Sequence, residues 1–131
     1  MGFSAACTAV SATFRADIRQ EAALVAEFAD KFAALEGVVV IGTHEAPHIL
    51  SLAIPGVPVQ NTINILQDHG ICVSAGSACA KGHRSHVLSA MNLSPETIDS
   101  SFRISLCRDT TREELEELYT VLQDEVLPRA R

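Results

Sequence analysis

The sequence has few positive charges and no long apolar run, and each shortage excludes a class of protein. Lysine and arginine together number 10 against 16 aspartates and glutamates, which gives a net charge of -6. An acidic chain without a basic stripe is poorly suited to nucleic acid, so we expect no such partner. No apolar run reaches the roughly 20 residues that a membrane-spanning helix needs, so we expect no membrane association.

A secretory signal and paired cysteine motifs are missing as well. The first residues include no lysine or arginine, so we expect a cytoplasmic protein. In that compartment the cysteines are expected to be free thiols, and none has C-x-x-C spacing. The four cysteines are Cys7, Cys72, Cys79 and Cys107. Cys7 in a predicted helix and Cys72 in an apolar run are expected to pack in the core, whereas Cys107 has no assigned role.

What the chain does contain is typical of a folded domain, with 47% hydrophobic and 20% charged residues. Apolar residues recur at helical spacing in the first segment, which predicts a long helix from Ser4 to Glu36 that stops at Gly37. Because this length exceeds that of an ordinary globular helix, we expect residues 1–36 to form an interdomain helix. Residues 37–131 are then expected to form a C-terminal small domain.

The remaining patterns alternate between strands and helices. Runs of β-branched or alternating residues predict strands at 38–42, 49–54, 71–73 and 102–106. Capping residues, prolines and apolar spacing predict helices at 58–69, at 85–91, from 94 onward, and at 111–128. The expected caps are Ser85, Ser94 and a capping box of Thr111 with Glu114, and Asn92 can take a left-handed exit. The residues of the last helix that are expected to face inward are Leu115, Leu118, Leu122 and Val126. The fold class is therefore α+β: a small, mostly antiparallel sheet of about four strands with helices packed on it.

Cys79 is the strongest candidate for a reactive group. Its segment, residues 74–84, consists mostly of small residues with little apolar area to bury, which predicts a mobile loop. A thiolate attacks sulfur far better than a thiol does, and it needs exposure and nearby positive charge. Such charge can come from the basic residues that follow, namely Lys81, His83, Arg84 and His86. Two other interpretations stay open: a cysteine without a role, and a zinc site with the histidines, although the spacing matches no common zinc motif.

Arg103 is the second candidate. It lies within the predicted strand 102–106, where a charged residue is unusual unless it is paired. A guanidinium held on a strand can bind a carboxylate through two parallel hydrogen bonds. Taken alone, the position is explained more simply by an arginine on a solvated sheet edge.

Several strings of the sequence resemble the cysteine desulfurases of the class V aminotransferase superfamily. The cysteine segment reads Ser-x-Gly-Ser-Ala-Cys, which is similar to the NifS/IscS-like subgroup with a long cysteine loop. The other matching strings are residues 49–56, 85–93, 102–106 and 110–115. The resemblance covers nearly the whole chain and is to the family's C-terminal, small domain.

The resemblance implies an enzyme that depends on pyridoxal 5'-phosphate and works as a homodimer. Such an enzyme removes sulfur from L-cysteine, leaving L-alanine and an enzyme persulfide, and passes the sulfur to an acceptor protein for iron–sulfur cluster assembly or thiolation. On this resemblance Cys79 is the catalytic nucleophile, in a loop with Gly76, Ser77 and Ala78. Arg103 is the residue that binds the substrate carboxylate.

The chain also departs from the family. Its only lysines are Lys31 and Lys81, and neither lies in the Ser-x-His-Lys string that holds the family's cofactor. We therefore expect the large cofactor-binding domain to lie outside this chain, which alone would bind neither cofactor nor metal and would be inactive. Cys107 stands where the family usually has glycine. Two alternatives are a selenocysteine lyase-like relative, against which the Cys79 string argues, and a stand-alone persulfide carrier or interaction module.

Overall fold

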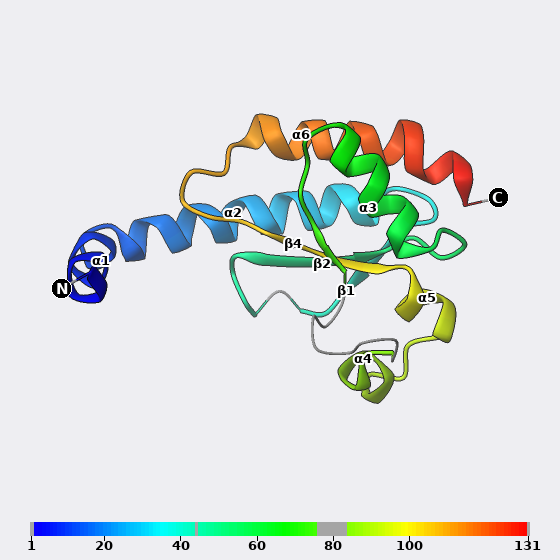
Figure 1. Cartoon of the computed structure of the whole chain (residues 1–131), viewed down its shortest axis with the longest axis horizontal. Coiled ribbons are helices and arrows are strands. Elements are labelled where there is room, and N and C mark those ends of the chain that lie inside the picture. Colours follow the sequence, from blue (N-terminus) through cyan, green and yellow to red (C-terminus); the bar gives the residue numbers. More distant parts are fainter. Residues whose placement is uncertain (1, 44, 76–83, 131) are drawn as a thin grey trace.

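The computed structural model describes residues 2–43, 45–75 and 84–130. Its described part contains one sheet of four strands in the order β1-β2-β4-β3, and every neighbouring pair is antiparallel. Helices α2, α3 and α6 lie on one side of this sheet, and the short helix α4 lies on the other (Figure 1). The predicted α+β class, with its small antiparallel sheet, is confirmed.

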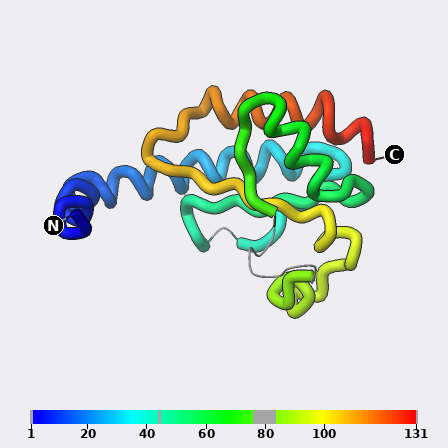
Figure 2. The backbone as a smooth tube through the Cα atoms, viewed as in Figure 1, coloured from blue at the N-terminus to red at the C-terminus, as the bar shows by residue number. Residues whose placement is uncertain are grey.

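The predicted single N-terminal helix is wrong, because the structure divides it into α1 (Gly2–Ser11) and α2 (Phe14–Ala33). Thr13 lies at the break, where its hydroxyl donates to the Asp17 carboxylate at 2.7 Å and its carbonyl accepts from Asp17 N at 3.0 Å. Thr13 is the N-cap residue of α2, so the second helix begins anew at this position. α1 projects beyond the sheet and buries none of its residues (Figure 2).

The strands are short and their register is well defined. β1 (Val39–Ile41) pairs with β2 (Ile49–Ala53), and β2 pairs with β4 (Ser101–Ser105). β3 (Ser74–Ala75) forms the other edge of the sheet beside β4. The strand predicted at 71–73 is therefore misplaced. α3 (Val59–Asp68) precedes this segment and is terminated by Gly70, which has a φ of 75°. The Ile71 amide then donates back to the Leu66 carbonyl of α3.

Alternation along the strands gives the sheet one apolar face. Leu50 and Leu52 of β2 and Phe102 and Ile104 of β4 are all buried in the hydrophobic core. They pack with Phe28 and Phe32 of α2, with apolar residues of α3 and α6 (Leu66, Leu115 and Leu118), and with Leu122 and Val126 of the segment that follows α6. The inward residues predicted for the last helix are all buried. No helix in the described residues has both the length and the apolar character to span a membrane.

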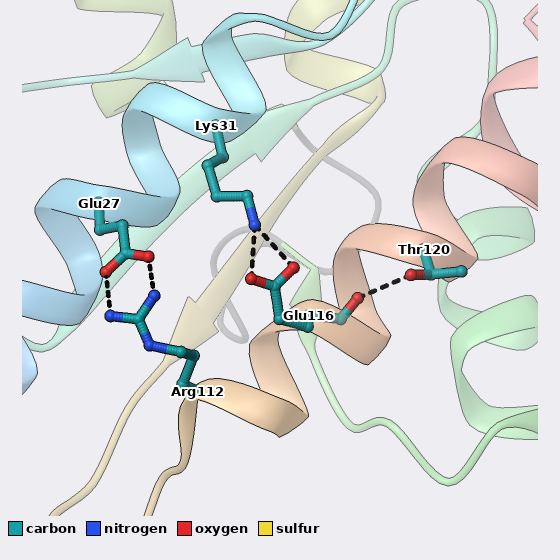
Figure 3. Close-up of polar contacts among 5 residues, drawn as sticks. All are labelled: Glu27, Lys31, Arg112, Glu116 and Thr120. Carbon is teal, nitrogen blue, oxygen red and sulfur yellow. Dashed lines mark hydrogen bonds and ion pairs between the residues drawn. The ribbon is translucent and has the colours of Figure 1, made fainter.

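Two ion pairs join α2 to α6 (Arg112–Val121) across the outside of the helical layer (Figure 3). Lys31 Nζ contacts the two carboxylate oxygens of Glu116 at 2.5 and 2.6 Å, and Arg112 binds both oxygens of Glu27. The predicted capping box is present, with Thr111 and Glu114 bonding each other's backbone amides. Beyond α6 the chain continues as a π-helical segment (Leu122–Val126) and a 3-10 turn (Leu127–Arg129).

Two short helices connect β3 to β4. α4 (His86–Ala90) begins at Ser85, whose hydroxyl accepts from the Leu88 amide, and α5 (Pro95–Asp99) begins at Ser94 in the same manner. Asn92 between them has a φ of 58°, the left-handed conformation that asparagine tolerates. These caps and the asparagine exit were predicted from the sequence and are confirmed. α5 is followed by Ser100 alone before β4 begins.

Candidate functional site

The face of the sheet away from α2 and α6 carries a pocket of about 260 Å³. Its lining comes from the sheet on one side and from the start of α4 on the other. The lining residues are Ile41, Ser51, Ser101, Phe102 and Arg103 from the sheet, and Ser85, Val87 and Leu88 from α4 and its cap. A mixed lining of this type, apolar with a few polar groups that converge, is typical of small-molecule sites.

Arg103 lies in the middle of this face. It pairs with Ser51 of β2 on one side and with Ser74 of β3 on the other, so it is on an interior strand and not on a sheet edge. Its neighbours Phe102 and Ile104 are buried in the core, whereas Arg103 itself is exposed on the opposite face. Among residues 2–43, 45–75 and 84–130, no carboxylate forms an ion pair with Arg103. The guanidinium is therefore held by a rigid strand and is available to a ligand.

The α4 side of the pocket is attached to the rest of the domain through Arg84 and Asp99. Arg84 Nε donates to Asp99 Oδ1 at 2.7 Å, and Nη2 donates to Oδ2 at 2.6 Å. This hydrogen bond raises the pKa of Arg84 and lowers the pKa of Asp99, so both groups stay charged. The sequence suggested Arg84 as a source of positive charge for Cys79, but the structure shows its charge paired with Asp99.

Cys79 and the loop residues Gly76, Ser77 and Ala78 lie outside the described residues, as do Lys81 and His83. Both ends of their segment are described. Ser74 and Ala75, predicted to belong to the loop, form β3 opposite Arg103 and Phe102. At the other end, Arg84 binds Asp99 and precedes Ser85 in the pocket wall. The structure therefore brings both flanks of the cysteine segment to the Arg103 pocket.

The other three cysteines are all exposed, so the prediction that Cys7 and Cys72 pack in the core is wrong. Cys7 is exposed because α1 buries nothing, and Cys72 because the chain forms no strand there. Cys107 follows β4, where its amide donates to Thr110 Oγ1 at 2.9 Å and its sulfur accepts from the same hydroxyl at 3.6 Å. Exposure alone therefore does not distinguish one thiol from another.

The described residues do not fit a pyridoxal phosphate site. Lys31 is engaged with Glu116 and lies over the rings of Phe28 and Tyr119, at 4.9 and 5.1 Å from their centres. Lys31 points from α2 toward Glu116 of α6 (Figure 3), and it is not among the residues that line the Arg103 pocket. Within the described ranges no three histidine, cysteine or acidic side chains are grouped to hold a metal. The zinc alternative depends on Cys79 and His83, which lie outside those ranges.

The sequence did not identify Asp99, Ser51 or Leu88 as part of the site. Asp99 is separated from Arg84 by 15 residues, and an acidic residue at the end of a short helix gives no signal of its partner. Ser51 had a usable signal, since it is the polar residue in an otherwise apolar strand. In an antiparallel sheet its alternation places it on the face opposite Leu50 and Leu52.

The chain belongs to the class V aminotransferase family, whose model matches residues 1–118. Within that family the named relatives are cysteine desulfurases, which confirms the resemblance drawn from the sequence.

The relatives are considerably longer than this chain. Cysteine desulfurase of a Nostoc species is 35% identical over 91 residues, covering 68% of this chain and 22% of the relative. Cysteine desulfurase IscS of Escherichia coli is 41% identical over 80 residues, covering 60% of this chain and 19% of the relative. A NifS-like protein of Rickettsia africae superposes with a TM-score of 0.80 at 25% identity, covering 94% of this chain and 32% of that structure. The chain thus spans about a fifth of the length of these curated relatives.

Proposed function

We propose that this chain is the small domain of a cysteine desulfurase, in which Arg103 binds the carboxylate of L-cysteine and Cys79 accepts its sulfur. The observation that carries the proposal is the Arg103 pocket with both flanks of the cysteine segment at its border. Cys79 is five residues from Ser74 and five from Arg84. Because each residue spans at most about 3.6 Å, the covalent chain keeps Cys79 within about 18 Å of both.

The bonds that form and break in the proposed reaction define the roles of Arg103 and Cys79. L-cysteine and the Cys79 thiol give L-alanine and a Cys79 persulfide, so one sulfur–sulfur bond forms and one carbon–sulfur bond breaks. Arg103 orients the substrate through two charge-assisted hydrogen bonds, and the Cys79 thiolate attacks the sulfur. Carbon–sulfur cleavage needs the electron sink that pyridoxal phosphate supplies, and the residues that hold this cofactor belong to a part of the enzyme outside the chain.

Two further features of the family belong to this proposal. The whole enzyme is a homodimer, and its persulfide passes to a sulfur-acceptor protein. A stand-alone persulfide carrier is the second candidate, favoured by the engagement of Lys31 with Glu116, which leaves no fitting cofactor lysine among the described residues. The two candidates differ in one measurement, because only the first requires a cofactor-binding region joined to this chain.

The test replaces Cys79 in the complete enzyme, with the cofactor-binding region present. Cys79→Ser should abolish protein-bound persulfide while the cofactor absorbance is retained. Cys107→Ser is the matched control, since it removes another thiol and should leave sulfur transfer in place. Undiminished transfer by Cys79→Ser would reject the role of Cys79. The 131-residue chain alone should release no sulfide from L-cysteine, and turnover by the purified chain would contradict the placement of the cofactor site outside it.

A further inference from the structure

The ion pair between Arg84 and Asp99 lies where the two walls of the Arg103 pocket begin. Arg84 directly precedes Ser85. Ser85 is the first residue of the α4 wall, which continues with Val87 and Leu88. Asp99 is the last residue of α5, and the sheet wall of Ser101, Phe102 and Arg103 starts two residues later. One contact therefore joins the starting points of both walls.

The geometry of this contact restricts orientation as well as distance. The guanidinium and the carboxylate meet through two roughly parallel hydrogen bonds, of 2.7 and 2.6 Å. A paired arrangement of this kind fixes the plane of both groups, which a single contact does not. Asp99 is itself held by a backbone that bonds on both sides of it, since Ser100 and Ser101 donate their hydroxyls to the carbonyls of α5.

Among the described residues, the other contacts of α4 with the secondary structure are mainly those to α5. None of its residues is buried, and Val87 remains 56% exposed. By contrast, α2 and α6 are fixed by a continuous apolar core, to which their ion pairs are an addition. A helix without buried residues depends on its polar contacts for its position. The Arg84–Asp99 pair is thus placed to determine where the α4 wall stands relative to Arg103.

We propose that Arg84 and Asp99 are positioning residues, whose ion pair sets the separation of α4 from Arg103 and so the fit of a carboxylate-bearing amino acid in the pocket. The part of the proposal that concerns the ligand rests on the proposed function. Asp99 has a second effect, because it occupies the Arg84 guanidinium. Among the described residues that border the pocket, Arg103 is then the guanidinium left to bind the substrate carboxylate.

The effect of this pair should appear in the pocket and hardly in global stability. Its side chains are 54% and 51% exposed, and exposed ion pairs contribute little to folding. The same pair acts on a wall of the site, where a small displacement of a contact group weakens a well-oriented complex. A variant should therefore keep its unfolding temperature while α4 and ligand binding change.

The experiment uses the 131-residue chain, with Asp99→Asn, Arg84→Lys and the control Glu27→Gln. The control removes another two-bond arginine–carboxylate pair, on the opposite side of the sheet. Hydrogen exchange of the α4 amides reports its attachment, and nuclear Overhauser contacts between Leu88 and Ser51, which line the pocket from opposite walls, report the pocket width. The shift of the Arg103 Nε–H signal during titration with L-cysteine reports binding.

Asp99→Asn should speed α4 exchange and weaken L-cysteine binding by about two- to fivefold each, the scale of an exposed ion pair. Arg84→Lys keeps the charge but loses the fork, so it should fall between Asp99→Asn and the unaltered chain, and Glu27→Gln should match the latter. Unchanged exchange and unchanged Leu88–Ser51 contacts in Asp99→Asn would overturn the positioning role. If the unaltered chain shows no Arg103 shift with L-cysteine, the proposed function fails instead, and the exchange data still decide whether the pair positions α4.

Discussion

The two faces of the sheet come from the same strands but have opposite requirements. On the covered face, Leu52 and Phe102 lie side by side and fully buried beneath α2 and α6. On the open face, one residue away on each strand, Ser51 and Arg103 lie side by side at the pocket. The core and the site share the same strands, and the face to which a side chain points decides whether it belongs to the core or to the site. A substitution at one face should therefore affect stability, and a substitution at the other should affect binding.

Phe102→Ala tests the covered face and should have the largest effect. Its ring is only 1% exposed, and truncation of such a residue costs about 3–5 kcal/mol through lost burial and the cavity left behind. Urea unfolding of the 131-residue chain measures this free energy. A cost below 1 kcal/mol, a conservative bound on core truncation, would show that the covered face is not a packed core.

Arg103→Ala tests the open face, one residue away. It should leave the unfolding midpoint nearly unchanged, because the side chain is exposed. In the complete enzyme it should lower kcat/KM for L-cysteine by the equivalent of about 2–5 kcal/mol, the typical cost of losing a partner of a bound charge. Ser105→Ala, on the same strand and face but outside the pocket lining, is the control. An unaltered kcat/KM for Arg103→Ala would remove the carboxylate anchor from the proposal.

Glu116→Gln examines whether the helical layer depends on its ion pairs or on its core. Lys31 and Glu116 are 34% and 43% exposed, so the loss should be about 1 kcal/mol or less. Glu117→Gln, an exposed neighbour on α6, should cost still less. Urea unfolding of both variants measures the difference. A loss of several kcal/mol in Glu116→Gln would mean that the ion pairs, and not the buried residues, hold α2 against α6.

The pH response of α4 should give the smallest effect. The hydrogen bond from Arg84 lowers the pKa of Asp99 in the folded chain, so the pair stabilises α4 at every pH above the ordinary aspartate range. The stabilisation is lost as the pH falls through the lowered pKa. The transition of α4 that depends on Asp99 should thus lie below about pH 4. Asp99→Asn should lack this transition, and an identical transition in that variant would assign it to another group.

The sequence predicts those parts of the molecule that short-range patterns determine. Alternation at Phe102–Arg103–Ile104 correctly separates buried from exposed positions, and Ser85, Ser94 and Thr111 act as helix caps as predicted. These features depend on residues within three or four positions of one another. The class of fold follows from them, since helices and antiparallel strands of these lengths have few ways to bury their apolar faces.

Other features depend on a choice between two local structures or on partners distant in the sequence, and short-range patterns do not predict them. The apolar spacing continues through Thr13 and carries no signal of the break that the structure has between Ser11 and Phe14. Ile71 and Val73 are strand-forming residues, but the Ile71 amide donates to the Leu66 carbonyl at the end of α3 and not to a neighbouring strand. The pairing of Arg84 with Asp99 spans 15 residues, and only the folded chain shows that these two groups meet.

The pleat of β4 also restricts how this domain can change over time. Phe102 and Arg103 are neighbours in the sequence with opposite surroundings, one in the core and the other at the pocket. A one-residue insertion or deletion inside the strand would exchange these surroundings for every following position. It would place a guanidinium in the core and an aromatic ring in the pocket at once. Lineages of this domain can therefore alter β4 by substitution, while changes of length are confined to the segments outside the sheet.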